Sequence, residues 1–130
     1  MELILGLGTD MIDVARVNRL ISKGSSFIES VFTEGEIVYC DSKRYRAQHY
    51  AARFAAKEAF LKALGTGWRD GITFRDIELV HDELGKPSLV VSGQASVICR
   101  DRFPRGYRTH VSVAHLKDYA TATVIIEEEE

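Results

Sequence analysis

The sequence predicts one α+β domain in which an N-terminal strand and several helices pack on an antiparallel sheet. Three observations support this fold class. Apolar residues alternate at 3–8 as in a strand, helix signals fill the first half of the chain, and strand-like segments dominate the part from 72 to 127. Helices that come early and strands that come late indicate the α+β class. A length of 130 residues is that of a single domain.

Capping residues mark the helices of the first half. Asp13 can N-cap a helix over residues 14–23, where apolar residues recur at helical spacing. Thr33 and Glu36 form a capping box at the start of a short helix. We expect a long helix from about residue 45 to 64, because two glycines follow it.

The second half of the chain carries the turn signals of strands. Residues 72–92 are typical of strand, turn and strand, with a glycine and a proline at the turn. Residues 93–103 are expected to form a helix. Residues 108–127 alternate as a closing hairpin that turns at 116–118.

Membrane and secretory functions find no support in the sequence. No apolar run reaches the roughly 18 residues that span a bilayer, and the N-terminal segment lacks the basic flank and length of a signal peptide. Cys40 and Cys99 stand far apart with no metal-binding or redox spacing, so we expect two reduced, partly buried thiols. The expected location is the cytoplasm.

The chain ends in four consecutive glutamates. The formal net charge is −2, and removing these four acids changes it by four, to +2. We expect residues 1–126 to form the domain and residues 127–130 a solvated acidic tail, because like charges oppose ordering. A mildly basic domain favours an acidic partner.

Four charges interrupt the apolar segment "RFAAKEAFLKALGTG", residues 53–67. Glu58 and Lys62 stand four residues apart, so they share a helix face and could form an ordinary solvated salt bridge. The glycine-rich segment just past Lys62 suggests a second interpretation. Backbone N–H groups of such a loop and a neighbouring lysine can contact phosphate oxygens.

Asp10 closes the first strand in the segment "GLGTD". The segment is not a dinucleotide fingerprint, because Met11 stands where the third glycine belongs. Asp10 is therefore either a turn residue or one of two carboxylates, with Glu58, that hold a Mg²⁺ ion.

The strand "HVSVAH" contributes two histidines that point to opposite faces, so they are not expected to share a metal. His110 is either a hydrogen-bonded sheet residue or a functional one. Ser112 lacks the context of a nucleophilic serine.

Together the segments resemble a known family over nearly the whole chain. "GLGTDMIDVARV", "FTEGE", "ARFAAKEAFLKALGTG", "DIEL…GKP" and "HVSVAHLKDYATATVI" occur in that order. In these motifs the sequence resembles the holo-[acyl-carrier-protein] synthase family of 4′-phosphopantetheinyl transferases. The resemblance implies the fold of that family, a homotrimer, and transfer of the 4′-phosphopantetheine arm of coenzyme A to a serine of apo acyl carrier protein in fatty acid biosynthesis.

The resemblance also implies the roles of individual residues. Asp10 and Glu58 would bind Mg²⁺, and Lys62 would contact the pyrophosphate. Coenzyme A would be contacted by Arg53, Lys62, Gly65, Thr66, Lys86 and His110. Arg16, Arg19 and Lys23 would bind the acidic carrier, although the same residues could be a solvated basic face. For the proton of the carrier serine we expect a water on the metal, or Glu58 through water, and then His110.

Three other functions remain as alternatives. A non-catalytic module that binds a divalent metal or coenzyme A would need the same carboxylates. A purely structural oligomer would need neither of them. Nucleic-acid binding has the least support, because the net charge is near zero and aromatic residues do not alternate with basic ones.

Overall fold

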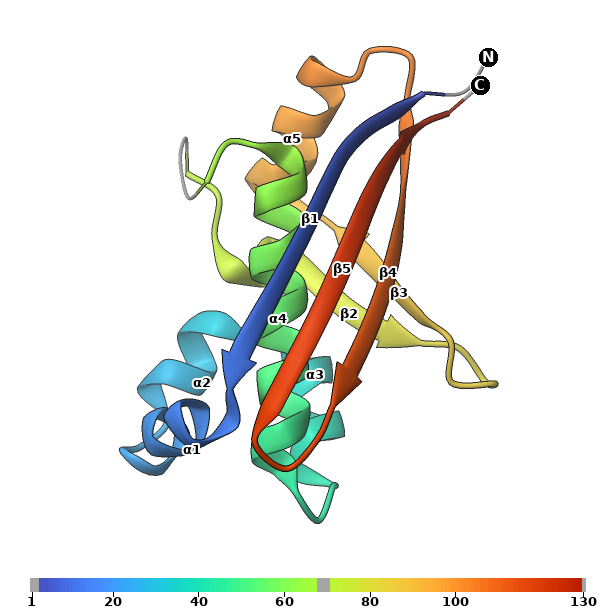
Figure 1. The fold of residues 1–130 in the computed structure, drawn as a ribbon. Helices are drawn as coiled ribbons and strands as arrows, with labels where there is room; N and C mark the ends of the chain where they lie inside the picture. Colours follow the sequence, from blue (N-terminus) through green and yellow to red (C-terminus); the bar gives the residue numbers. More distant parts are fainter. Residues whose placement is uncertain (1–2, 68–70, 130) are drawn as a thin grey trace.

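The computed structural model describes residues 3–67 and 71–129 of the chain (Figure 1). Its elements are β1 (Ile4–Asp13), α1 (Val14–Ser22), α2 (Ser26–Val31), α3 (Glu34–Asp41), α4 (Arg46–Leu64), the 3₁₀ turn η1 (Phe74–Asp76), β2 (Ile77–His81), β3 (Pro87–Val91), α5 (Gly93–Arg102), β4 (Tyr107–His115) and β5 (Tyr119–Glu128). The predicted α+β class and the order of its main elements are confirmed.

The main sheet joins the two ends of the chain. Its strand order is β1-β5-β4, and both pairings are antiparallel. The first strand pairs with the last from Ile4↔Glu127 to Asp13↔Tyr119. Strands β2 and β3 form a separate hairpin. Helix α4 lies along one face of the main sheet (Figure 1).

Helix α4 is the centre of the core, and 13 of its 19 residues are buried. Its many alanines leave little side-chain volume between the helix and its neighbours, so strands can approach closely. Each strand of the sheet alternates between a face that packs on α4 and an outer face.

Strand β1 approaches α4 through two glycines. A Cβ atom on Gly8 would lie 2.0 Å from the carbonyl oxygen of Ala59, and one on Gly6 would lie 1.9 Å from that of Ala63. Any side chain at these positions would overlap the helix backbone. The "GLG" segment is thus what allows strand and helix backbones to touch, just before Asp10.

Three local predictions are confirmed by the structure. The Asp13 side chain accepts hydrogen bonds from the first turn of α1, and Thr33 and Glu36 form both halves of a capping box. Cys40 and Cys99 are free and buried. Helix α2 was not predicted, because its six residues are too few for a periodic apolar pattern.

The predicted acidic tail is wrong for Glu127 and Glu128. Both belong to β5, where Glu127 pairs with Arg108 and Glu128 pairs with Arg105. Basic side chains nearby offset the like-charge repulsion that was expected to prevent ordering. Glu129 follows the strand, and Glu130 lies outside the described residues.

Within residues 3–67 and 71–129, no helix combines the length and the apolar character that crossing a bilayer requires.

Replacing Gly8 by Ala should destabilise the fold by about 3 kcal/mol, since the added methyl group would force β1 off α4. Gly85→Ala is the matched control, because Gly85 has φ +86° but nothing within 4 Å of the place that a methyl group would take. The control variant should lose only about 1–2 kcal/mol of folding stability, which is the cost of an alanine in the left-handed backbone region. Urea unfolding of both variants measures the difference, and equal losses would contradict the close approach.

Candidate active site

Asp10 meets the last turn of α4. It does not close the first strand as predicted, because β1 continues to Asp13 and Asp10 pairs with Ala122 inside it. Lys62 Nζ lies 2.9 Å from Asp10 Oδ1 and donates a second hydrogen bond, of 3.0 Å, to the carbonyl oxygen of Thr9. The side chain of Lys62 is 56% exposed and that of Asp10 only 15%. Two of the residues that were singled out in separate segments are therefore in direct contact.

The second carboxylate lies one helical turn away. Glu58 precedes Lys62 by four residues on α4, so both point to the same side of the helix. They line an open hollow of about 280 Å³ together with Leu61, Gly65 and Gly67. Gly65, at φ +81°, ends the helix in the left-handed region, as the glycine signal predicted. Thr66 lies in the adjoining loop but does not line the hollow.

This group of residues suits a hard divalent cation. Asp10 Oδ2 is buried and has no hydrogen-bond partner within the described part of the chain. An orphaned carboxylate oxygen is costly unless something satisfies it, and a cation does so. Among residues 3–67 and 71–129, no three His, Cys, Asp or Glu side chains are placed so that they could hold a metal ion together. Mg²⁺ does not need three such side chains, because it binds through one or two carboxylates together with phosphates and waters.

Arg53 lies on another face of α4. Its side chain is buried, its guanidinium carbon lies 4.1 Å from the centre of the Tyr39 ring, and its Nη2 lies 3.4 Å from His81 Nδ1. It lines a hollow of about 170 Å³ with residues of α3 and β2. Arg53 and Lys57 share the helix face that meets β2, whereas Glu58 and Lys62 share the next face around.

Lys86 and His110 are also separated from Asp10. Lys86 is exposed in the turn between β2 and β3. His110 stands on the outer face of β4, 54% exposed, with Nε2 3.0 Å from Glu127 Oε1. Helix α4 packs on the opposite face of that sheet. Within one chain the predicted residues therefore lie in separate groups. Only the group around Asp10 and Lys62 brings several of them together.

Glu127 is held ionised by its neighbours on the outer face. Arg108 Nε donates to Glu127 Oε1 at 2.8 Å. The hydrogen bond from Arg108, and then that with His110, lowers the pKa of Glu127 below its usual value. His110 thus has a structural partner, as the hydrogen-bonded sheet interpretation expected.

The three basic residues predicted to bind a carrier are all exposed. Arg16 and Arg19 belong to α1, and Lys23 is its C-terminal cap. Asp13 fixes the start of this helix by accepting hydrogen bonds from two of its backbone N–H groups, at 2.8 and 3.4 Å. Because α1 begins directly after β1, its basic face starts within a few residues of Asp10.

Sequence reasoning missed an aromatic and histidine cluster beside Arg53. The Tyr39 ring stacks on His81 with ring centres 5.3 Å apart, and His49 lies between Tyr39 and His115 at 5.8 and 4.8 Å. Burial, and then the nearby positive charge of His115, lowers the pKa of His49 to about 4. The three histidines come from α4, β2 and β4, and no sequence spacing links them.

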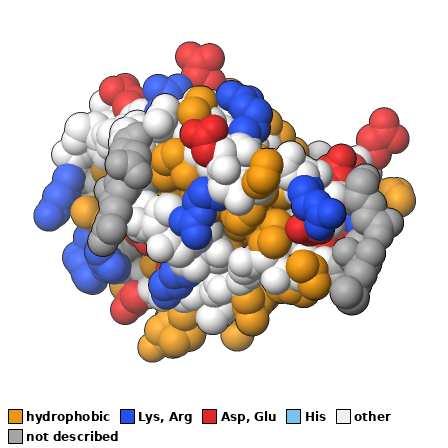
Figure 2. Space-filling model, turned by 90° about the horizontal axis from the view of Figure 1, so that it is seen from above, with side chains coloured by type: hydrophobic (Ala, Val, Ile, Leu, Met, Phe, Trp, Pro, Cys, Tyr) orange, Lys and Arg blue, Asp and Glu red, His pale blue; other side chains and the backbone are white. Residues whose placement is uncertain are grey.

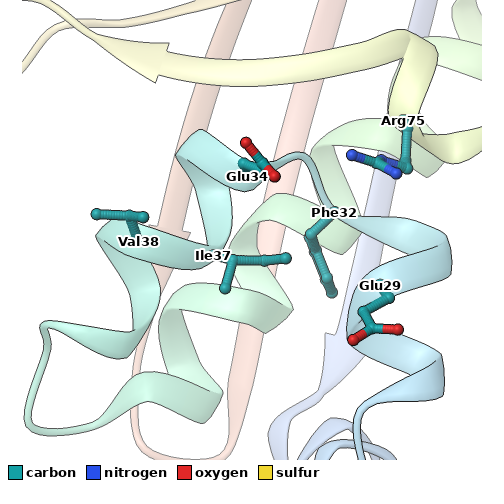
Figure 3. A pocket seen from close by; sticks show the side chains of 6 residues that line it. All are labelled: Glu29, Phe32, Glu34, Ile37, Val38 and Arg75. Atoms are coloured by element: carbon teal, nitrogen blue, oxygen red, sulfur yellow. The ribbon is translucent and has the colours of Figure 1, made fainter.

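Another hollow lies outside the predicted site. It has a volume of about 550 Å³ and opens between α2, α3 and η1, with Phe32 toward its floor and acidic Glu29 and Glu34 on either side (Figure 3). Arg75 lies above them. None of the residues predicted from the sequence lines it.

Basic side chains are spread over the end of the molecule at which α5 lies (Figure 2). On this face they stand among apolar and acidic groups instead of gathering in one area. Helix α1, with the predicted carrier-binding residues, lies at the opposite end (Figure 1).

The fold and the site together define a class of protein. An α+β domain places a carboxylate from a strand against a lysine, with a second carboxylate one turn away from that lysine beside a glycine loop. This arrangement suits an enzyme that handles phosphate esters with a divalent cation.

The family model of the 4′-phosphopantetheinyl transferase superfamily matches residues 6–124. The chain belongs to this superfamily, as its motifs predicted, and it is a 4′-phosphopantetheine transferase.

Similar proteins agree on the family and the fold. A holo-[acyl-carrier-protein] synthase of Geobacter sulfurreducens is 46% identical over 126 residues, which cover 96% of this chain and 98% of that protein. The crystal structure of the synthase from Neisseria meningitidis is 35% identical with a TM-score of 0.84, covering 98% and 100% of the two chains. The Bacillus anthracis synthase, solved in complex with CoA (3′,5′-ADP), is 34% identical with a TM-score of 0.79 over 97% and 98%.

We predict that folding stability falls as the pH drops from about 6.5 to about 4. An unfolded His49 takes up a proton near its ordinary pKa of 6.5, whereas the folded one does so only at about 4. The unfolded state therefore binds more protons in this window, and stability rises with pH across it.

His49→Gln should flatten this slope in urea unfolding experiments at several pH values. His110→Gln is the control, because His110 is exposed and lies outside the cluster. An unchanged slope in His49→Gln would show that His49 protonates normally in the folded state.

Proposed function

We propose that the chain transfers the 4′-phosphopantetheine arm of coenzyme A to a serine of apo acyl carrier protein. The products are holo acyl carrier protein and adenosine 3′,5′-bisphosphate, and the reaction serves fatty acid biosynthesis in the cytoplasm. The observation that carries the proposal is the group formed by Asp10, Lys62 and Glu58, in which one buried carboxylate oxygen has no protein partner within the described residues. The names of the relatives agree with this reaction.

In this proposal Asp10 and Glu58 hold Mg²⁺. When bound, the ion supplies electrostatic stabilisation of the negative charge that develops as the pyrophosphate breaks. Lys62 is exposed enough to contact the same phosphates, and its hollow borders the loop at Gly65. Thr66 lies in that loop, where its side chain can approach the same ligand.

A side chain of this protein can accept the proton of the carrier serine. Glu58 is the first candidate, acting through a water, because it lies in the hollow with Lys62. His110 is the second. It is exposed on the outer sheet face, and its contact with Glu127 would orient the ring.

We further propose a homotrimer in which neighbouring subunits complete each site. Arg53, Lys86 and His110 would contact coenzyme A from a subunit adjacent to the one that supplies Asp10. The outer face of the sheet supports an interface, because Leu7 and Met11 are each 64% exposed there. Exposed apolar side chains on a flat sheet face are typical of contacts between subunits.

The experiment that tests the function is a transfer assay with coenzyme A, Mg²⁺ and an apo carrier protein. The carrier should gain the mass of one phosphopantetheine arm. Binding of coenzyme A with no gain in carrier mass would favour the non-catalytic metal and coenzyme A module instead.

Glu58→Gln should lower the transfer rate by about 100- to 1000-fold, the loss seen when one electrostatic stabiliser is removed. The control is Glu29→Gln on α2, which changes the same chemical group outside the site. Mass spectrometry of the carrier over time gives both rates, and circular dichroism checks the fold. Near-normal transfer by Glu58→Gln at saturating Mg²⁺ would contradict the assignment.

For the acyl carrier protein we propose docking on Arg16, Arg19 and Lys23. Arg16→Glu should raise the KM for the carrier strongly and flatten its dependence on salt, because steering by charge is screened beyond about 10 Å at 0.1 M salt. Arg100→Glu on α5 makes the same charge change at the other end of the molecule. If both variants keep the wild-type salt dependence in steady-state kinetics, the basic face of α1 is only solvated.

A further inference from the structure

Lys62 is paired with one oxygen, Oδ1, of the proposed metal ligand Asp10. Its ammonium lies 2.9 Å from Asp10 Oδ1 and 3.0 Å from the carbonyl oxygen of Thr9. Both acceptors belong to β1, so the lysine side chain leans from α4 toward the strand. The contact joins two residues that are 52 positions apart in the sequence.

The two partners differ in their freedom to move. Asp10 is only 15% exposed, and the neighbouring Gly8 holds its strand against the backbone of α4. Lys62 is 56% exposed at the end of a flexible four-carbon stem. If the pair separates, the lysine leaves and the aspartate stays.

A divalent cation and an ammonium group repel each other when both contact one carboxylate. Two neighbouring positive charges repel each other, several times more strongly near a protein surface than in bulk water, and the double charge of the cation doubles the repulsion. A cation that binds Asp10 therefore competes with Lys62 for it. The adjacent hollow at Gly65 gives the displaced ammonium a new position beside any phosphate bound there.

We propose that Lys62 is an internal counter-ion of Asp10 that a divalent cation must displace, and that substrate phosphates promote the exchange by attracting Lys62. This inference rests on the proposed function for the identity of the phosphates, but the exchange itself requires no transfer reaction. Its consequence is a positive coupling between the binding of metal and of coenzyme A. By linkage, each ligand should raise the affinity for the other by the same factor.

The test measures binding of Mn²⁺, whose free ion gives an electron paramagnetic resonance signal that is lost on binding. Without coenzyme A, Lys62→Met should bind Mn²⁺ up to about fivefold more tightly than wild type, since an ion pair of this exposure is worth up to about 1 kcal/mol. Lys62→Gln is the second variant, because its amide can keep the hydrogen bond to Thr9.

Lys117→Met is the matched control, since it removes one exposed lysine from the turn between β4 and β5. An equal gain in that variant would mean that net charge alone is responsible and would overturn the proposal. Unchanged or weaker Mn²⁺ binding in both Lys62 variants would overturn it as well. Asp10→Asn should abolish binding in wild-type and Lys62→Met backgrounds alike, and persistence of binding would move the metal away from Asp10.

Coupling is measured by repeating the titrations with saturating coenzyme A. Wild-type affinity for Mn²⁺ should rise by a larger factor than that of Lys62→Met, in which no ammonium remains to be attracted. Equal factors would contradict the second half of the proposal. A chain that lacks transfer activity yet shows the Mn²⁺ differences would disprove the proposed function and leave the counter-ion role standing.

Discussion

The buried ion pair of Lys57 and Glu36 is the contact on which the arrangement of the helices and the small hairpin depends. Lys57 Nζ donates to Glu36 Oε1 at 2.8 Å, to the carbonyl oxygen of Phe74 at 3.0 Å and to that of Ile77, so all three N–H groups are used. Glu36 also accepts from the backbone of Leu79 at 3.0 Å. Both side chains are fully buried, and burial lowers the pKa of Lys57 while the Glu36 carboxylate opposes that shift. Removing one member of such a pair typically costs about 3–5 kcal/mol, because the other charge stays buried alone.

That pair also sets the orientation of α4, and with it the site. Successive residues of a helix point about 100° apart, so fixing Lys57 toward η1 and β2 turns its neighbour Glu58 to a different face. The same rotation carries Lys62 to β1, where the glycines allow the strand to come within contact of the helix backbone. The side chains of the group around Asp10 thus come from packed secondary structure and not from long loops. Sites built on rigid elements hold their geometry more closely than sites on loops.

Most helices and strands could be predicted from local signals, because helix caps and the alternation of apolar residues depend on only a few neighbouring residues. The capping box at Thr33 is an example, and the structure contains both of its hydrogen bonds. What sequence could not supply was the pairing of distant residues. Lys57 looked like one more charge on a half-apolar helix, because its partner lies 21 residues away. The tail prediction failed for the same reason, since the cations that pair with Glu127 stand on another strand. The contact between Asp10 and Lys62 was not predicted. The family resemblance assigned both residues to one site, with separate roles, and neither spacing nor composition indicates that they pair.

The separation of the remaining predicted residues has a simple geometric meaning. His110 faces away from α4 on the outer side of the sheet, so no side-chain rotation can bring it past β5 to the site at Asp10. Arg53 is anchored among Tyr39 and His81 on the far side of the helix from β1. If these residues act on one ligand with Asp10, they must act from another copy of the chain. A site divided in this way is complete only in the assembled oligomer, which would make assembly a condition for binding coenzyme A and not merely for stability. The exposed apolar side chains of the outer sheet face, Leu7 and Met11 among them, are where such copies would be expected to meet.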